Sequence, residues 1–290
     1  MVHAGQPLSG ASIANGVSNR LMTIENGVLT HHSFEPPVMY PIGNNSNVDF
    51  IAYYPFFGGA NAIDSFIPVN VADQETGLPT EVLFSNNITN QAPTLNPVTL
   101  NFHYSLAKLE IMVTSGANAI NFQNTTITVS VEGMYTQASL RLTNGTFTHH
   151  REKQTITLYH TGSTTTSASF QALVLPTNAT ITFLFDVGGV VHRHTMTADF
   201  VAANLYRLNF ALNFPAFPEP TATLLNAVII PRDVNTQDIS VDDTLSVTIN
   251  GIRWATRNVD MPGTFVANRE DAGMFFQRHK RVGWSSTDPL

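Results

Sequence analysis

The chain has 290 residues, enough for one to three domains with substantial cores. Only 12% of the residues are charged, about half the share of ordinary soluble domains, and the net charge is −7 with basic residues scattered singly. This pattern excludes the basic surface of a nucleic-acid-binding protein. The absence of cysteine excludes disulfides, cysteine-ligated metals and thiol catalysis.

The first ten residues, MVHAGQPLSG, lack the basic start and apolar core of a signal peptide. No apolar run in the chain is long enough to span a membrane as a helix. We therefore expect that any export signal has been removed or lies upstream of this sequence.

The first strong strand pattern is VDFIAYYPF, residues 48–56, in which a proline closes the run. Alternating aromatic residues usually pack inside a sheet, so we expect five aromatic side chains here to fill the core of a first β-sandwich. They are Phe50, Tyr53, Tyr54, Phe56 and Phe57. The alternative is a surface platform for sugar stacking, which would expose Tyr53 or Tyr54.

Period-two alternation recurs along the chain. In TLNFHYSLAKLEIMV the inward face shifts at Ala107–Lys108, which predicts a β-bulge or a bend where the strand changes partner. Residues 127–131 and 206–212 alternate as buried strands, and Asn144–Gly145 and Gly188–Gly189 predict tight hairpin turns. Many short strands without intervening helices indicate antiparallel β-sandwiches.

Two proline-containing stretches mark domain boundaries, NQAPTLNP at 90–97 and the linker NFPAFPEPTAT at 213–223. The segment that follows, TLLNAVII, is apolar, uncharged and strand-prone. It either returns as the last strand of the second domain or pairs with another molecule by strand exchange. The residues that would carry such an exchange are Leu224, Leu225, Val228, Ile229 and Ile230.

Several stretches occur in a consistent order between residues 18 and 214: NRLMTIENGVLTHHSFEPPVMYP, VDFIAYYPF, DQETGLPTEVLFSNN, LNFHYSLAKLEIMV, SFQALVLP and LYRLNFALN. Together they resemble the fimbrillin (Mfa-like) family of Bacteroidales surface proteins. The resemblance implies two transthyretin-like β-sandwich domains in tandem, export, and a lipid anchor on an N-terminal cysteine that this chain does not contain. It also implies, for some members, polymerisation by inserting a donated strand into a neighbour's groove.

The C-terminal stretch VTINGIRWATRNVDMPGTFVANREDAGMFFQRHKRVGWSSTDP resembles the opening of the Fibrobacter major paralogous domain, a module of bacterial surface proteins. We therefore expect an all-β chain that ends in a partial third module. Its parts are 1–95 and 96–214 as the two sandwiches, 215–243 as a Pro-rich linker with a donor or returning strand, and 244–290 as the partial module.

The sequence shows no set of residues with the types and spacing of a catalytic, metal-binding or cofactor-binding site, and we expect no such site. His192 and His194 share one strand face, but none of the 10 histidines has the spacing of a zinc site. The acidic pairs Asp242–Asp243 and Glu270–Asp271 fall in predicted loops. The sequence also lacks the tight glycine-flanked serine turn of hydrolases, the phosphate-binding P-loop and the glycine-rich motif of dinucleotide-binding proteins.

The resemblance predicts a non-enzymatic adhesion protein of the cell surface, a fimbrial (pilus) subunit or a tip or accessory component that assembles by strand addition. Its partners would be other fimbrial subunits or host and bacterial surface ligands, including glycans, but no nucleic acid. It would reach the outer membrane only through the lipid anchor. The alternative is a carbohydrate-binding surface module, with Tyr53, Tyr54, Trp254 and Trp284 as stacking residues. An enzyme would require carboxylates or histidines that converge in a pocket.

Overall fold

The computed structural model describes residues 1–25, 28–31, 38–43, 46–58, 66–116, 120–213, 220–234, 246–249, 252–255, 275–276 and 283–284. The chain forms two compact units, Met1–Val234 and Asn235–Leu290, which we call the first and second unit. The secondary structure of the described residues is mostly strand, and the helical elements among them are two short 3-10 turns, η1 (Gly10–Ser12) and η2 (Ala14–Gly16). The predicted all-β class is confirmed. The described residues contain no helix long and apolar enough to cross a membrane.

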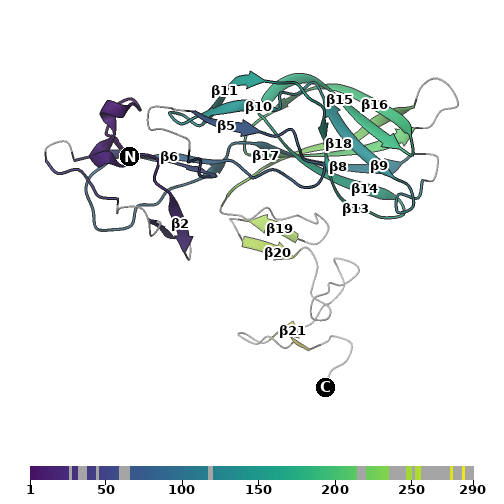
Figure 1. The fold of residues 1–290 in the computed structure, drawn as a ribbon. Helices are drawn as coiled ribbons and strands as arrows, with labels where there is room; N and C mark the ends of the chain where they lie inside the picture. The colour runs from purple at the N-terminus through teal and green to yellow at the C-terminus, as the bar shows by residue number, and fades with distance from the viewer. Residues whose placement is uncertain are drawn as a thin grey trace. The chain divides into compact units, whose positions relative to one another are not determined.

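The first unit is dominated by a nine-stranded sheet (Figure 1). In spatial order its strands are β12 (Ile156–Thr157), β9 (Ile127–Glu132), β15 (Thr177–Val187), β16 (Val190–Phe200), β18 (Thr221–Pro231), β17 (Asn204–Asn213), β8 (Ala107–Ser115), β14 (Ser167–Val174) and β13 (Tyr159–Ser163). Most neighbours are antiparallel, whereas β17 runs parallel to β8.

The core of this sheet lies between its two halves, which curl to face each other. Phe183 and Phe185 of β15 contact Phe210 of β17, with ring centroids 5.3 and 4.9 Å apart. Since β16 and β18 lie between these strands in the sheet, such contacts require the sheet to fold over on itself as a sandwich. The alternating positions predicted to face inward on β9 and β17 are all buried, because every second side chain of a strand points to the same face.

Two smaller sheets and a hairpin complete the first unit. A four-stranded sheet has the order β1 (Val2–His3), β4 (Val48–Tyr54), β6 (Leu83–Gln91) and β7 (His103–Tyr104). A three-stranded sheet has the order β11 (Thr146–Arg151), β10 (Gln137–Arg141) and β5 (Phe66–Asn70), and β2 (Met22–Glu25) pairs with β3 (Val28–His31). Because β5 pairs with β10, the segments predicted as two sandwiches share a sheet. A tandem of two domains with a boundary near residue 95 remains a prediction.

The chain changes sheets between β7 and β8. Tyr104 of β7 pairs with Leu83 in the four-stranded sheet, whereas β8 lies between β14 and β17 in the nine-stranded sheet. The connecting residues Ser105 and Leu106 are only 2% and 0% exposed. The inward face shifts here because the strand exchanges one set of partners for another. Of the two alternatives predicted for this stretch, the bend with a change of partner is therefore confirmed.

The predicted turn at Asn144–Gly145 joins β10 to β11. The Asn144 side chain accepts a hydrogen bond from the Thr146 backbone N–H at 3.2 Å. Gly145 has a φ of 71°, and a Cβ at this position would lie 2.4 Å from the ring of Phe84. Glycine is therefore required both by the left-handed backbone and by the buried ring beneath it.

The second unit contains two short strand pairs among its described residues. β19 (Ser246–Ile249) pairs with β20 (Ile252–Ala255), and β21 (Phe275–Phe276) pairs with β22 (Gly283–Trp284). The predicted partial module, 244–290, falls in this unit, and most of it lies outside the described residues. Its likeness to the Fibrobacter module remains a prediction.

Candidate functional site

The predicted strand-exchange segment forms β18, which pairs with its own chain. β18 runs antiparallel to β17 from Thr221↔Asn213 to Pro231↔Asn204. On its other side it meets β16 in a single parallel pair, Arg193↔Thr221. Beyond that pair, the edge of β18 that faces β16 has no strand partner in the described part of the chain. A strand with one open edge can accept another strand.

The apolar side chains of β18 are covered near its start, whereas most of those from Leu225 onward are exposed. Ala222 is 5% exposed and Leu224 is half-buried, whereas Leu225, Val228 and Ile229 are 60%, 38% and 59% exposed. Three large apolar side chains thus reach solvent on a strand that carries no charge. Exposed apolar groups that lie together on one element are typical of interaction sites.

Two histidines of β16 hold the start of β18. The Nδ1 of His192 donates to the Thr221 carbonyl at 3.3 Å, and the Nδ1 of His194 donates to the Ala222 carbonyl at 3.0 Å. Burial lowers the pKa of His192, while hydrogen bonds to the Thr221 and Asn213 carbonyls oppose this shift. The sequence placed these two histidines on one face, and the structure shows that face turned toward β18.

One arginine holds the end of β18. The Arg232 guanidinium forms an ion pair with the Glu81 carboxylate and lies 3.8 Å from the ring centroid of Tyr104. The Arg232 backbone N–H also donates to the Ala203 carbonyl at 2.7 Å. Arg232 is 8% exposed, so its charge depends on these partners. β18 is therefore fixed at both ends while its middle remains exposed.

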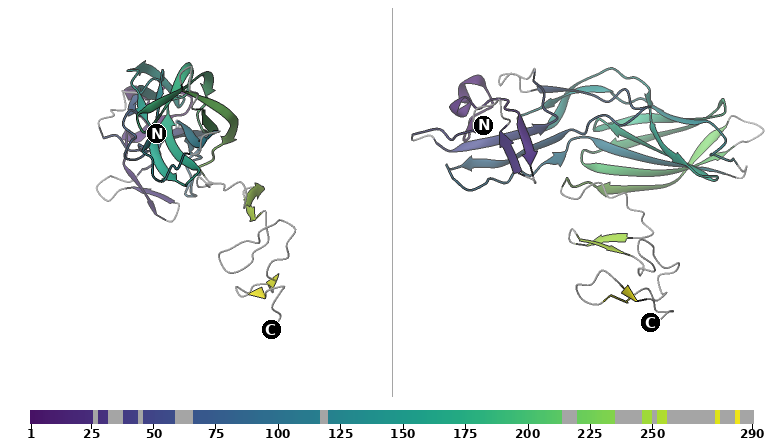
Figure 2. Two further views of the ribbon diagram at one scale, coloured as in Figure 1. Left: turned by 90° about the vertical axis from the view of Figure 1, so that its right-hand side faces the viewer. Right: turned by 60° about the horizontal axis from the view of Figure 1, so that its bottom comes forward.

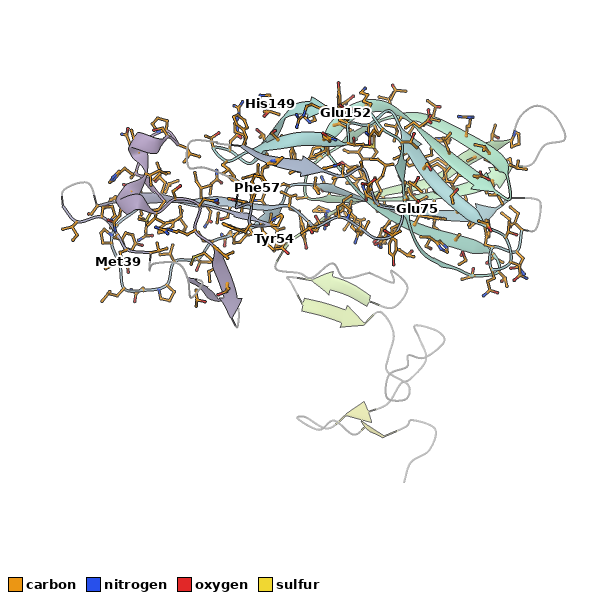
Figure 3. The ribbon with its side chains drawn as sticks, in the orientation of Figure 1. Met39, Tyr54, Phe57, Glu75, His149 and Glu152 are labelled. Carbon is orange, nitrogen blue, oxygen red and sulfur yellow. The ribbon has the colours of Figure 1, made fainter. Side chains whose placement is uncertain are left out.

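The aromatic run around β4 does not fill a core as expected (Figure 3). Tyr54, Phe56 and Phe57 are 48%, 41% and 40% exposed. Phe50 and Tyr53 are half-buried, and the Tyr53 hydroxyl donates to the Asn19 side chain. The core prediction is wrong for the three exposed residues. The register of β4 with β6 shifts twice, which disrupts the alternation of faces, and the proline leaves residues 56 and 57 beyond the strand.

The proposed stacking residues are thus distributed between both units. Tyr54 is accessible at the end of β4, whereas Tyr53 is held by its hydrogen bond. Trp254 pairs with Val247, and Trp284 pairs with Phe275, in the backbone ladders of the second unit. The placement of the two tryptophan side chains lies outside what the structure describes, so a shared stacking platform remains a prediction.

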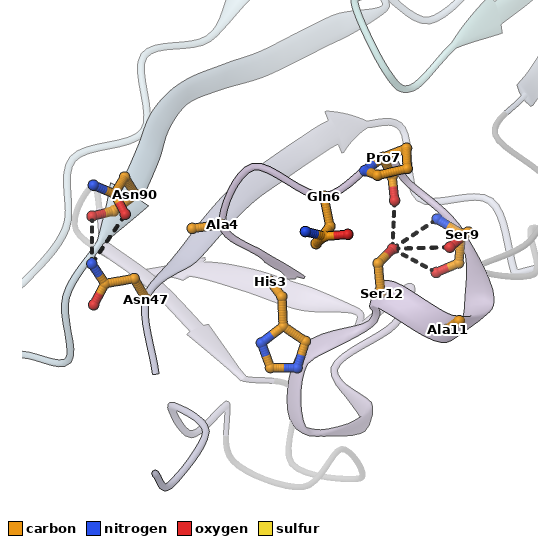
Figure 4. Close-up of a pocket in the computed structure, with 9 residues that line it drawn as sticks. All are labelled: His3, Ala4, Gln6, Pro7, Ser9, Ala11, Ser12, Asn47 and Asn90. Atoms are coloured by element: carbon orange, nitrogen blue, oxygen red, sulfur yellow. Dashed lines mark hydrogen bonds between the residues drawn. The ribbon is translucent and has the colours of Figure 1, made fainter. Parts of the chain in front are cut away.

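A polar pocket lies near the N-terminus (Figure 4). Its volume is 570 Å³, and it is lined by His3, Ala4, Gln6, Pro7, Ser9, Ala11, Ser12, Asn47 and Asn90. Sequence reasoning missed this pocket, because its residues come from three separate segments and none stands out by its type or spacing.

No cluster of three or more histidine, aspartate or glutamate side chains that could hold a metal ion occurs among the described residues. The acidic pairs Asp242–Asp243 and Glu270–Asp271 lie outside those residues. His192 and His194 instead donate to backbone carbonyls.

The sequence matches the family model described as fimbrillin-like over residues 2–248. The match spans most of the chain, so this protein belongs to the fimbrillin-like family, as the sequence predicted. This membership also confirms the predicted fimbrial adhesion role and a place in cell-surface fimbriae.

Two solved structures share the fold. A candidate cell adhesion protein from Bacteroides uniformis is 21% identical, with a TM-score of 0.51 over 70% of this chain and 80% of that one. Another, from Bacteroides ovatus, is 16% identical, with a TM-score of 0.54 over 80% and 91% of the two chains. No curated protein matches the sequence.

Proposed function

We propose that this chain is a fimbrial subunit, or a tip or accessory component, that assembles by accepting a strand from another subunit at the open edge of β18. The observation that carries the proposal is the single pair between β16 and β18, beyond which this edge of β18 has no strand partner among the described residues. An incoming strand would gain main-chain hydrogen bonds along this edge.

The side chains around this edge suit an apolar partner strand. Leu224 of β18 and Met196 and Ala198 of β16 are half-buried and pack against the main core. Leu225 and Ile229 are more exposed and would be covered by the added strand. Burial of apolar area contributes roughly 25 cal/mol per Å² removed from water. Because β18 carries no charge, such assembly depends little on salt.

Acceptance of a strand is favoured over donation of β18 itself. If β18 left β17, Arg232 would lose its contacts with Glu81 and Tyr104. Removing one partner from a buried ion pair costs about 3–5 kcal/mol. The antiparallel ladder with β17 would be lost as well. Adding a strand to the open edge keeps all of these contacts.

The partners of this chain would therefore be other fimbrial subunits, and the fimbrium would be held at the outer membrane by a lipid anchor. We also infer that the chain is not an enzyme. Its family is one of fimbrial proteins, and the two histidines closest to the proposed site are engaged by backbone carbonyls.

The test is the oligomeric state of the full chain, measured by light scattering behind size exclusion with and without limited proteolysis. We expect oligomers that grow with concentration. Leu225→Lys should reduce them at least tenfold, because the added charge would be buried by the incoming strand. Leu95→Lys is the matched control, since Leu95 is 105% exposed on a loop. A wild-type chain that stays monomeric under every condition would contradict assembly through β18.

Carbohydrate binding is a second candidate function. It is favoured by the exposure of Tyr54, Phe56 and Phe57 at the end of β4, because sugar rings stack on accessible aromatic faces. Loss of glycan binding in Tyr54→Ala, with unchanged oligomerisation, would assign the binding to this aromatic group.

A further inference from the structure

The polar pocket near the N-terminus is built from three parts of the first unit. The loop and turn from His3 to Ser12 form one side, and Asn47 and Asn90 form the other (Figure 4). Asn47 precedes β4 and Asn90 lies in β6, so a paired sheet supports that side. The volume of 570 Å³ falls within the range of about 300–1,000 Å³ that is usual for small-ligand sites.

Hydrogen bonds fix the two sides relative to each other. The Asp49 carboxylate accepts from the Gly5 N–H at 3.1 Å and from the Asn90 N–H at 2.7 Å. Asn47 Nδ2 donates to Asn90 Oδ1 at 3.0 Å. The 7%-exposed Ser12 stabilises the turn, because its Oγ donates to the Pro7 carbonyl and accepts from the Ser9 N–H. A site ordered in this way loses little entropy when a ligand binds.

Three amide side chains retain hydrogen-bonding groups for a ligand. Within the described part of the chain, the Gln6 side-chain amide makes no hydrogen bond, and Figure 4 shows it between Ser12 and the Asn47–Asn90 pair. Asn47 uses only its Nδ2 group, which leaves its Oδ1 as an acceptor. Asn90 uses its Oδ1, which leaves its Nδ2 as a donor. The pocket thus presents both donors and acceptors.

The lining favours a neutral ligand. Among the described residues, it contains no lysine, arginine, aspartate or glutamate side chain. The Asp49 carboxylate accepts from the backbone N–H groups of Gly5 and of the pocket residue Asn90, and its negative charge would repel an anion. Small apolar groups of Ala4, Pro7 and Ala11 line the same space. Hydroxyl groups both donate and accept, and a pyranose ring combines several of them with apolar C–H faces.

From this chemistry we propose that the pocket binds a neutral saccharide, a refinement that rests on the proposed function in surface adhesion. Among the described residues of the lining, His3 alone has an aromatic ring, so the stacking area is small. We therefore expect a dissociation constant of about 1 mM for a single sugar, with multivalent display along a fimbrium raising the avidity by about 100-fold or more.

The position of the pocket is compatible with assembly through β18. Figures 1 and 2 show the N-terminus and the turn between β15 and β16 at opposite ends of the first unit. The pocket residues lie near the N-terminus, whereas β18 belongs to the nine-stranded sheet. A strand added to β18 would extend the nine-stranded sheet, to which none of the pocket residues belongs.

The test is saturation-transfer NMR on the full chain with methyl glycosides of galactose, glucose, mannose and N-acetylglucosamine, and with N-acetylneuraminic acid as an acidic probe. We expect at least one neutral sugar to bind and the acidic sugar to bind at least tenfold more weakly. The double variant Gln6→Ala/Asn90→Gly should weaken binding at least tenfold. Asn90→Gly retains the backbone N–H, and glycine tolerates the φ of 55° at this position.

Gln123→Ala is the matched control, because Gln123 is an exposed glutamine in a separate turn. Binding that persists in the double variant but disappears in Tyr54→Ala would place the sugar on the aromatic group and overturn this proposal. Absence of binding to every neutral sugar, both free and displayed on multivalent beads, would also overturn it. Neither result affects the oligomerisation test, so the two proposals fail independently.

Discussion

β17 and β18 are neighbouring strands of similar length and apolar character, yet they have opposite environments. In β17, Leu208, Phe210 and Leu212 are 3%, 0% and 0% exposed. In β18, the paired strand, Leu225 and Ile229 are 60% and 59% exposed. β17 has a strand on each side over residues 205–212, whereas among the described residues β18 pairs with β16 only at its first residue.

An apolar, strand-prone composition therefore does not by itself determine whether the side chains of a strand are buried. Tyr206 and Ile229 are directly paired across the two strands, and only Tyr206 is buried. The facing half of the sandwich covers β17 but leaves the far end of β18 uncovered. A strand placed in this way forms backbone hydrogen bonds within its own fold along one edge and presents the other edge for binding.

Phe210→Ala is expected to have the largest effect on stability. Phe210 is fully buried and contacts Phe183, Phe185 and the His194 ring. Removing this ring should lower the free energy of unfolding by about 3–5 kcal/mol, measured by urea denaturation. A loss below 1 kcal/mol would contradict a packed core between the two halves of the sheet.

A smaller loss, about 3 kcal/mol, is expected from Arg232→Met, because Glu81 would lose its partner, the buried Arg232 side chain that follows β18. Denaturation of the single variant and of Arg232→Met/Glu81→Gln would measure this effect. The double variant should recover at least half of the loss, since the remaining charge is then removed. If the double variant is as unstable as the single one, Arg232 acts through its packing on Tyr104 instead.

The contact between β16 and β18 predicts a dependence on pH. The pKa of His192 is lowered from 6.5 by burial, so the folded chain binds a proton less readily than the unfolded chain. The contribution of His192 to the free energy of unfolding is fully present above pH 6.5. It decreases as the pH falls toward the lowered pKa of His192 in the folded chain. Thermal unfolding between pH 7.5 and 5 would measure the slope. His192→Phe should flatten it, whereas His160→Gln, at an exposed histidine, should not.

The smallest effect is expected from Ile229→Ala. This side chain is 59% exposed, so its truncation should change the free energy of unfolding by less than about 1 kcal/mol. The same substitution should still reduce oligomerisation, because the lost contacts would form only in the assembly. A destabilisation as large as that of Phe210→Ala would mean that the far end of β18 belongs to the core.

Local sequence patterns predicted several strands of the nine-stranded sheet. Alternation over 127–131 and 206–212, and the turns at Asn144–Gly145 and Gly188–Gly189, agree with the structure, because each depends on residues close together in the chain. The shift before Lys108 was visible because a change of sheet reverses the buried face.

Other features depend on contacts between distant residues. The pairing of β5 with β10 joins segments that sequence reasoning assigned to different domains. Register shifts in β4 bring Tyr54 to the surface, and aromatic content alone does not predict them. The polar pocket combines the loop at 3–12 with Asn47 and Asn90. These positions acquire a common role only when the fold brings them together.

The route of the chain into and out of the nine-stranded sheet has a mechanical consequence. Lys108 near the start of β8, Leu205 near the start of β17 and Ile230 near the end of β18 lie side by side. The chain therefore enters and leaves this sheet at the same end. There the Ala203 N–H donates to the Leu106 carbonyl at 3.1 Å, and the Ala203 carbonyl accepts from the Arg232 N–H at 2.7 Å.

Tension applied across this junction would load the short backbone bridge through Ala203 and the Arg232–Glu81 ion pair. The aromatic core around Phe210 lies off the direct path of the force. A surface filament pulled by flow could thus stretch at the junction while the sandwich and its open β18 edge remain folded.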